Sequence, residues 1–305
     1  MNEPPVNRNR LQGYVQDISA RARDAWARVR QPGTGGRILS WSREQLRELV
    51  AGVRFLTVIP VPGSAWLSSS SGNVVDSRPV TGSAYGSLIG LVIGLLLSLI
   101  LLIFGGNALF DPHLPSIALA ALVVVAQVIL TGGLHLDGLM DSCDGLFGGK
   151  DRDSRLEIMR DSRVGGFGIL GVASVLLLKL VFLSSMDVHQ MVLALLVTLP
   201  AARAAMLLAV AIFPSARQNG LGSSFRQTVT LPRLLAVIII SLLIALIFGR
   251  LAGLLAWVIS NVVAFLIGMW TLRRVGGLTG DIYGAIVEVS EVCALLVLVL
   301  TRFWL

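Results

Sequence analysis

The sequence has little charge and little cysteine. Charged side chains make up 14% of the 305 residues, against roughly 25% in soluble domains, while 54% are hydrophobic and the mean hydropathy is +0.78. These values exclude a soluble domain and predict an all-α, polytopic bundle of membrane-spanning helices. The two cysteines, Cys143 and Cys293, cannot build a disulfide framework and are expected to be free thiols.

The N-terminal region lacks a hydrophobic core of the kind that a signal peptide has. Residues 1–50 are Arg-rich and polar, so we expect a cytoplasmic tail that leads into an amphipathic helix over 40–61. Residues 51–305 then form the membrane-embedded domain. The net charge of +7 is attributed to cytoplasmic loops, and no nucleic-acid partner is expected.

Apolar runs near the length of a membrane span recur along the chain. Seven are predicted, at 83–104, 116–136, 165–184, 189–213, 232–249, 251–271 and 284–303. The fifth and sixth meet at Arg250, which indicates a tight hairpin or a re-entrant piece. Nearly all loop Lys and Arg residues fall on the same side as the N-terminus. The tail and the long loops are therefore expected to face the cytoplasm, across a plasma (inner) membrane.

Negative charge is concentrated in one stretch, "GGLHLDGLMDSCDGLFGG" at 132–149. Asp137, Asp141 and Asp144 are spaced so that they fall within about 60° of one another on a helix. Carboxylate oxygens on one face suit Mg²⁺, and a glycine after the first and third aspartates leaves room for a ligand. The alternative is a solvated acidic helix end paired with loop arginines. Charge at a membrane boundary favours the metal site.

Other polar residues near this motif have both a functional and an ordinary interpretation. His135 lies on the opposite side of the helix, where it contacts substrate or makes a structural hydrogen bond. Arg160 and Arg163 could clamp phosphate, or they belong to a basic cytoplasmic loop. Asp161 orients one of these arginines or adds a metal ligand.

A second acidic face lies near the C-terminus, in "GGLTGDIYGAIVEVSE". Asp281 and Glu288 are seven residues apart and share a helical face, with Glu291 on nearly the same side. This face could complete the metal site, or it could contact Arg203, the cation inside the fourth span, which could itself serve a phosphate site. Lys179 in the third span is expected to be snorkelling or paired rather than catalytic.

The motifs together resemble one enzyme family. "GGLHLDGLMDSCDGLFGG", "RLEIMRDSRVGGFG" and "GGLTGDIYGAIVEVSE", with the entry segment "RFLTVIPVP", closely resemble cobalamin synthase, the adenosylcobinamide-GDP ribazoletransferase family, over residues 54–303. The resemblance implies an integral-membrane, Mg²⁺-dependent transferase. Its substrates would be adenosylcobinamide-GDP and α-ribazole or α-ribazole 5′-phosphate, and GMP would be released.

The resemblance also implies roles for particular residues. The first motif contributes Asp137, Asp141 and Asp144 as catalytic and metal-binding groups, with Asp144 the candidate base. The C-terminal motif adds Asp281 and Glu288 to the metal site. The predicted substrate-binding residues are His135, Arg160, Asp161, Arg163, Arg203 and Glu291. The ribose 3′-hydroxyl would attack phosphorus while the metal neutralises the diphosphate.

Two other functions stay open at this point. A phospholipid synthase of the CDP-alcohol phosphotransferase type also has a membrane-embedded Asp–Gly cluster, but its motif places Ala-Arg after the first Asp-Gly, where "DGLMDSCDG" has Leu-Met. A cation transporter predicts carboxylates near mid-span on broken helices, often with inverted repeats. No repeat is evident in this sequence, and most carboxylates lie at predicted helix ends.

Overall fold

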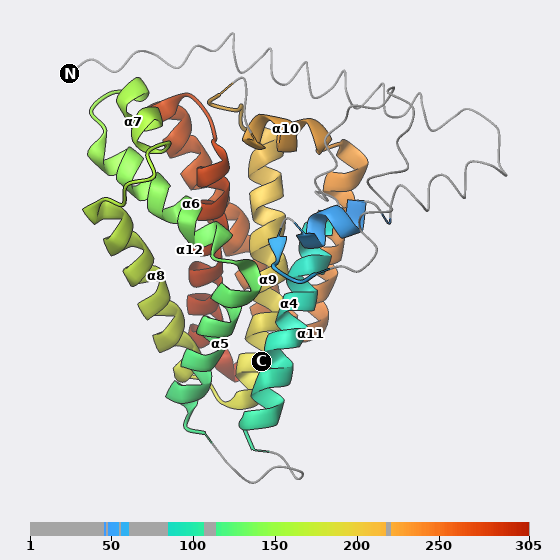
Figure 1. The fold of residues 1–305 in the computed structure, drawn as a ribbon. Helices are drawn as coiled ribbons and strands as arrows, with labels where there is room; N and C mark the ends of the chain where they lie inside the picture. Colours follow the sequence, from blue (N-terminus) through green and yellow to red (C-terminus); the bar gives the residue numbers. More distant parts are fainter. Residues whose placement is uncertain are drawn as a thin grey trace, which may run out of the picture.

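The protein is an α-helical bundle in the computed structural model, which describes residues 46, 48–54, 56–60, 85–106, 114–217 and 221–304. Within these ranges no strand occurs, and an isolated bridge joins Ser215 to Leu278. The helices, in chain order, are α4 (Gly86–Phe104), α5 (Ser116–Thr131), α6 (Leu134–Cys143), the π-helix η2 (Asp144–Gly148), α7 (Arg152–Ile158), α8 (Gly166–Ser184), α9 (Val188–Ile212), α10 (Leu221–Thr228), α11 (Leu231–Val275), α12 (Gly280–Leu300) and the 3₁₀ turn η3 (Arg302–Trp304) (Figure 1).

The long helices have the length and composition of membrane spans. Five of them, α4, α8, α9, α11 and α12, pass this test alone, and α5 with the α6–η2 segment makes a sixth when the bent pair is counted as one span. Their outward faces carry large apolar side chains such as Leu170, Ile247 and Leu266, which are 56% or more exposed. A soluble protein does not present such a surface to water. The all-α, multi-pass fold is confirmed.

Helix α9 is the central helix of the bundle, and 83% of its apolar 18-residue stretch is buried (Figure 1). It packs closely against α4, because a Cβ at Gly90 would be 2.7 Å from the Leu199 carbonyl oxygen and one at Gly94 would be 3.1 Å from that of Leu195. Small residues that let helix backbones approach are a common means of association in membranes, where apolar burial gives little driving force.

The second predicted span is bent, which corrects the boundary expected at 136. Helix α5 ends at Thr131, and the α6–η2 segment leaves it at 91°. Gly132 and Gly133 make the turn, because both have positive φ (61° and 70°), a conformation that glycine adopts without cost. The described part of the lead-in segment supports the bend, since the Val58 N–H donates to the Leu130 carbonyl at 2.9 Å.

That lead-in segment is helical at residues 46, 48–54 and 56, as predicted, but residues 57–60 are not helical, so the predicted helix over 40–61 is too long at its C-terminal end. Residues 1–45 lie outside the described part of the chain. Glu48 is buried and pairs with Arg233 at 3.0 Å.

Helix α11 folds back on itself at Arg250, whose φ of 49° and ψ of −130° are not helical. The Trp257 indole N–H donates to the Ser241 hydroxyl at 2.9 Å, although 16 residues of straight helix would separate them by about 24 Å. A Cβ on Gly253 would collide with the carbonyl of Ala245 in the other arm. Of the two alternatives left open for this segment, a tight hairpin or a re-entrant piece, the structure has the hairpin.

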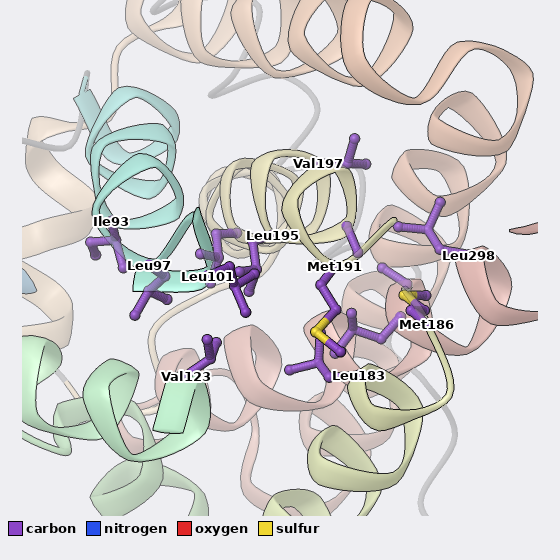
Figure 2. Close-up of a cluster of buried hydrophobic side chains, with 14 of the residues drawn as sticks. Ile93, Leu97, Leu101, Val123, Leu183, Met186, Met191, Leu195, Val197 and Leu298 are labelled. Carbon is purple, nitrogen blue, oxygen red and sulfur yellow. The ribbon is translucent and has the colours of Figure 1, made fainter. Parts of the chain in front are cut away.

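The two ends of the bundle differ in what they carry. At one end, a cluster of buried apolar side chains from α4, α5, α8, α9 and α12 forms the core shown in Figure 2, with Leu97, Val123 and Leu195 among its fully buried members. At the other end lie α7, α10 and the loops before and after α11 (Figure 1). Backbone hydrogen bonds of 2.8 Å from Leu278 N to Pro214 O and from Ala216 N to Leu278 O join the loop after α9 to the loop after α11.

Candidate active site

Two glycines bring the first acidic motif into contact with the last one. A Cβ at Gly138 on α6 would lie 2.7 Å from the Asp281 carbonyl oxygen, and one at Gly284 on α12 would lie 2.8 Å from the His135 carbonyl oxygen. The two helices thus cross backbone against backbone. The space beside Gly138 accommodates α12 rather than a ligand, and Gly145 likewise accommodates Met159 and the Arg155 carbonyl. Asp137 and Asp281 are held together by this crossing.

A cavity of about 320 Å³ opens at this crossing. Leu56 of the lead-in segment and Met206 of α9 contribute apolar walls. The remaining lining comes from α6, the 213–217 segment, α10 and the start of α12: Leu134, His135, Asp137, Gly138, Ser215, Arg217, Gly222, Ser223, Phe225, Thr279, Gly280, Asp281, Tyr283 and Gly284. Segments distant in the sequence thus meet at one site.

Carboxylates dominate the charge at this cavity. Asp137 is exposed on its wall, Asp281 is partly buried there, and Asp141 lies within electrostatic range of both. Arg217 approaches from the loop after α9, with its Nη1 atom 3.9 Å from Asp281 Oδ2. Thr279 caps α12 by accepting from the Ile282 N–H at 3.3 Å and donates to Asp281 Oδ2 at 3.1 Å. A concentration of negative charge of this kind favours a bound cation.

The third aspartate of the motif has a different environment. Asp144 is buried, and its two oxygens accept from the N–H groups of Gly165 and Gly168, each at 2.8 Å. It therefore caps the N-terminus of α8, where a carboxylate satisfies free backbone donors and complements the helix dipole. Seven residues of helix also separate Asp144 from Asp137, which corresponds to about 10 Å along the helix axis. Its proposed roles as base and metal ligand stay predictions.

A glycine substitution tests this cap. Gly168→Ala is expected to lower the free energy of unfolding by about 1–3 kcal/mol, because its Cβ would collide with the Asp144 carboxylate and lie 2.9 Å from the Met140 carbonyl oxygen. Gly166→Ala is the matched control, since a Cβ there meets nothing within 4 Å and alanine favours the helix. Thermal unfolding in detergent measures both. Equal melting temperatures would show that the cap tolerates the added methyl group.

The C-terminal glutamates lie deeper in the bundle than the cavity. Glu288 is on the same helical face as Asp281 but about 10 Å further along α12, and it accepts from Lys179 Nζ at 2.7 Å. Glu291 lies 3.0 Å from the same Nζ atom and also accepts from Gln127 Nε2 at 2.9 Å. The prediction that Lys179 is paired is confirmed. In this structure the two glutamates form a buried ion cluster with Lys179 and do not line the cavity.

Arg203 on α9 is a buried cation close to this cluster and is not among the residues that line the cavity. It is 1% exposed, and its Nη1 donates to the Leu199 carbonyl at 3.0 Å. Its Nε and Nη2 atoms are buried and make no hydrogen bond to the part of the chain that the structure describes. It is within electrostatic range of Glu288 and Glu291, so two basic and two acidic side chains lie near one another in this part of the bundle. His135, on α6, is buried and lines the cavity.

The arginines of the 150–163 segment divide into two groups. Arg152 donates to the carbonyls of Val275 and Ala216, and Arg155 donates to those of Arg274 and Lys150, so both fasten α7 to its neighbours. Arg163 is exposed and pairs with Asp161, its Nε 2.9 Å from Oδ2.

That pair keeps the pKa of Asp161 below its usual range, because Arg163 donates hydrogen bonds to the ionised form. The prediction that Asp161 orients an arginine agrees with this geometry. Arg160 is exposed and within electrostatic range of Arg217, so these two cations remain on the cavity side.

Residue spacing did not reveal the walls of the cavity. Tyr283 donates from its hydroxyl to the Gly222 carbonyl at 3.2 Å, and its ring centroid is 6.0 Å from that of Phe225. A Cβ at Gly222 would be 2.9 Å from the Gly280 nitrogen, so α10 packs directly on the start of α12. The glycines and arginines of 215–228 were a signal for this loop, but only the fold shows that Arg217 and Phe225 face the acidic residues.

Comparisons with known proteins agree with the motifs. The family model described as cobalamin-5-phosphate synthase matches residues 48–299. The chain is 37% identical over 250 residues to the adenosylcobinamide-GDP ribazoletransferase of Roseiflexus sp. (strain RS-1), covering 82% of this chain and 88% of the relative. It is 34% identical over 256 residues to that of Caldanaerobacter subterraneus subsp. tengcongensis, covering 82% and 97%. No solved structure gives a significant match.

Proposed function

We propose that this chain, which belongs to the cobalamin-5-phosphate synthase family, is an adenosylcobinamide-GDP ribazoletransferase of cobalamin biosynthesis. The observation that carries the proposal is the agreement between the family match over 48–299 and the cavity where both acidic motifs meet. The activity of these relatives needs a site for a nucleoside and a diphosphate, and the cavity combines apolar walls with two aspartates and Arg217.

The reaction is a phosphoryl transfer in which the residues around the cavity would have distinct roles. A ribose hydroxyl oxygen of α-ribazole bonds to the phosphorus attached to the cobinamide, and the bond from that phosphorus to the GMP oxygen breaks. GMP leaves with the bonding electrons, and the hydroxyl proton passes to a carboxylate. Asp137 lines the cavity and is the best placed of the three motif aspartates to accept it. Arg217 and Arg160 would bind phosphate oxygens as charge moves to the leaving group.

The donor set at the cavity fits Mg²⁺. Among the described residues no group of three His, Cys, Asp or Glu side chains is arranged to hold a metal alone. Mg²⁺ is commonly held by one or two carboxylates together with substrate phosphates, and Asp137 and Asp281 on the same cavity meet that requirement, with Asp141 nearby. When bound, the ion would neutralise the diphosphate and stabilise the entering and leaving oxygens.

We place the cavity on the cytoplasmic side of a plasma (inner) membrane. The end of the bundle that holds the cavity carries the loop cations Lys150, Arg152, Arg155, Arg160, Arg163, Arg217, Arg226, Arg233, Arg273 and Arg274, while the opposite end carries Arg250 and Arg302. Basic residues of short loops accumulate in the cytoplasm, which supports this orientation.

The function is tested with detergent-purified protein, Mg²⁺, adenosylcobinamide-GDP and α-ribazole. We expect GMP and a coupled corrinoid in equal amounts. A folded preparation that makes neither, yet turns over a CDP-alcohol substrate pair, would replace this function with the phospholipid-synthase alternative.

Metal removal gives a separate prediction. Excess EDTA is expected to abolish product formation, because two or three carboxylates and a diphosphate would then face one another without a cation. Addition of Mg²⁺ beyond the chelator should restore the initial rate, and Ca²⁺, with its looser coordination, should restore it poorly. The initial rate of GMP release measures both. Full activity in EDTA would remove Mg²⁺ from the mechanism.

A further inference from the structure

The size of the cavity limits what can enter it. Its volume of about 320 Å³ is near the lower limit of small-molecule pockets, which run from about 300 to 1,000 Å³. A nucleoside of about 20 non-hydrogen atoms is of this order of size, whereas a corrin macrocycle with its nucleotide arm is several times larger. The donor substrate therefore cannot be enclosed here as a whole.

The distribution of polarity within the cavity gives a second limit. Met206, Phe225, Tyr283 and Leu56 supply an apolar and aromatic side, and the Tyr283 hydroxyl is already bonded to Gly222. A guanine ring placed against this side would leave its hydrogen-bonding edge unpaired, which is costly in a buried site. The base of α-ribazole is a benzimidazole, which has one free ring nitrogen and no edge of donors and acceptors, so it suits an apolar, aromatic wall.

The carboxylates lie around the same small space. Asp137 on α6 and Asp281 on α12 both line it, and the backbone crossing at Gly138 and Gly284 fixes their separation. A ligand with an apolar ring at one end and hydroxyl groups at the other would match both parts of the lining. The nearest cation, Arg217, approaches Asp281 at 3.9 Å.

We propose that this cavity is the binding site of the acceptor nucleoside, with its aromatic base against Met206, Phe225 and Tyr283 and its ribose hydroxyls at Asp137 and Asp281. This proposal rests on the proposed function and assigns one of its two substrates to a place. The corrin ring and the guanosine of the other substrate then lie outside the cavity, and its diphosphate reaches the mouth beside Asp137 and Asp281. Phe225 and Met206 become specificity-determining residues for the acceptor.

The experiment measures the KM of each substrate separately. Phe225→Leu removes an aromatic surface that stacks on the base, a contact worth about 1–3 kcal/mol, so the KM for α-ribazole should rise about 5- to 150-fold. The KM for adenosylcobinamide-GDP should change by less than about twofold. The KM for α-ribazole 5′-phosphate should rise in parallel with that of α-ribazole, because the base is the same.

The matched control is Phe147→Leu, since Phe147 is 57% exposed and packs on Phe167 and Trp270 away from the cavity lining. Both KM values should stay unchanged in it. If Phe225→Leu fails to fold, Met206→Phe places a larger side chain in the cavity and reduces its free volume. This variant should also raise the KM for α-ribazole selectively.

Two results would overturn the assignment while leaving the proposed function intact. The first is a rise in the KM of the corrinoid substrate alone, and the second is wild-type KM values for both substrates. Absence of activity in the wild-type protein would instead count against the proposed function.

Discussion

Asp137→Asn is expected to lower turnover by about 10²–10³-fold, the loss typical when one group that stabilises transition-state charge is removed. The substitution keeps the size of the side chain but removes its negative charge and its ability to accept a proton. Asp137 is exposed on the cavity wall, and its side chain makes no hydrogen bond or ion pair with the described residues, so the melting temperature should change little. The initial rate of GMP release and thermal unfolding in detergent measure the two effects.

The same variant separates metal binding from proton transfer. Loss of a metal ligand should raise the Mg²⁺ concentration that gives half of the remaining activity. Loss of a base alone should leave that concentration unchanged. Asp153→Asn is the control, because Asp153 lies on α7, is exposed, and pairs with the neighbouring Arg152 away from the cavity lining. Wild-type turnover in Asp137→Asn would remove this residue from the active site.

Lys179→Met is expected to cause the largest loss of stability, about 3–5 kcal/mol in the free energy of unfolding. The side chain is buried, and its removal would leave Glu288 and Glu291 facing each other inside the bundle without the ammonium group that now lies 2.7 and 3.0 Å away. The cost arises from the uncompensated charge rather than from the value of the ion pair itself. A fall in melting temperature in detergent, with reduced yield, is the expected measurement.

A second substitution shows whether charge is the cause. Adding Glu288→Gln to Lys179→Met should recover about 1–3 kcal/mol, within the range of coupling energies between contacting residues. The control is Lys150→Met at the other lysine of the sequence, which is exposed and should change stability by less than about 0.5 kcal/mol. A double variant no more stable than Lys179→Met would show that packing, not charge, determines the loss.

The spans were predictable because each depends on local composition. A run of about 20 apolar residues must form a helix in lipid whatever surrounds it, since its backbone groups have no other partners. The hairpin at Arg250 followed from the same reasoning, because two full-length runs are joined there by a single charged residue. The bend at Gly132–Gly133 did not, because the apolar run continues past it and a Gly-Gly pair is also tolerated within a span.

The candidate site was only partly predictable. Residues that share a helical face can be identified from spacing, which correctly predicted a shared face for Asp137 and Asp141 and for Asp281 and Glu288. Spacing gives no depth, however, and seven residues of helix carry Glu288 about 10 Å further into the bundle, where Lys179 pairs with it. Asp144 shares the face of Asp137 but caps α8, a helix whose position depends on the whole bundle.

The sequence by itself therefore determined that this protein is a helical membrane protein, which side chains are candidates for its chemistry and which family it resembles. These properties depend on composition and local order, which act before any long-range contact forms. The tertiary structure decided which candidates share a cavity, which become caps or buried ion pairs, and which apolar residues complete the site. That division depends on helix crossings such as Gly138 against Asp281, where the approach of two backbones is set by packing across more than one hundred residues of chain.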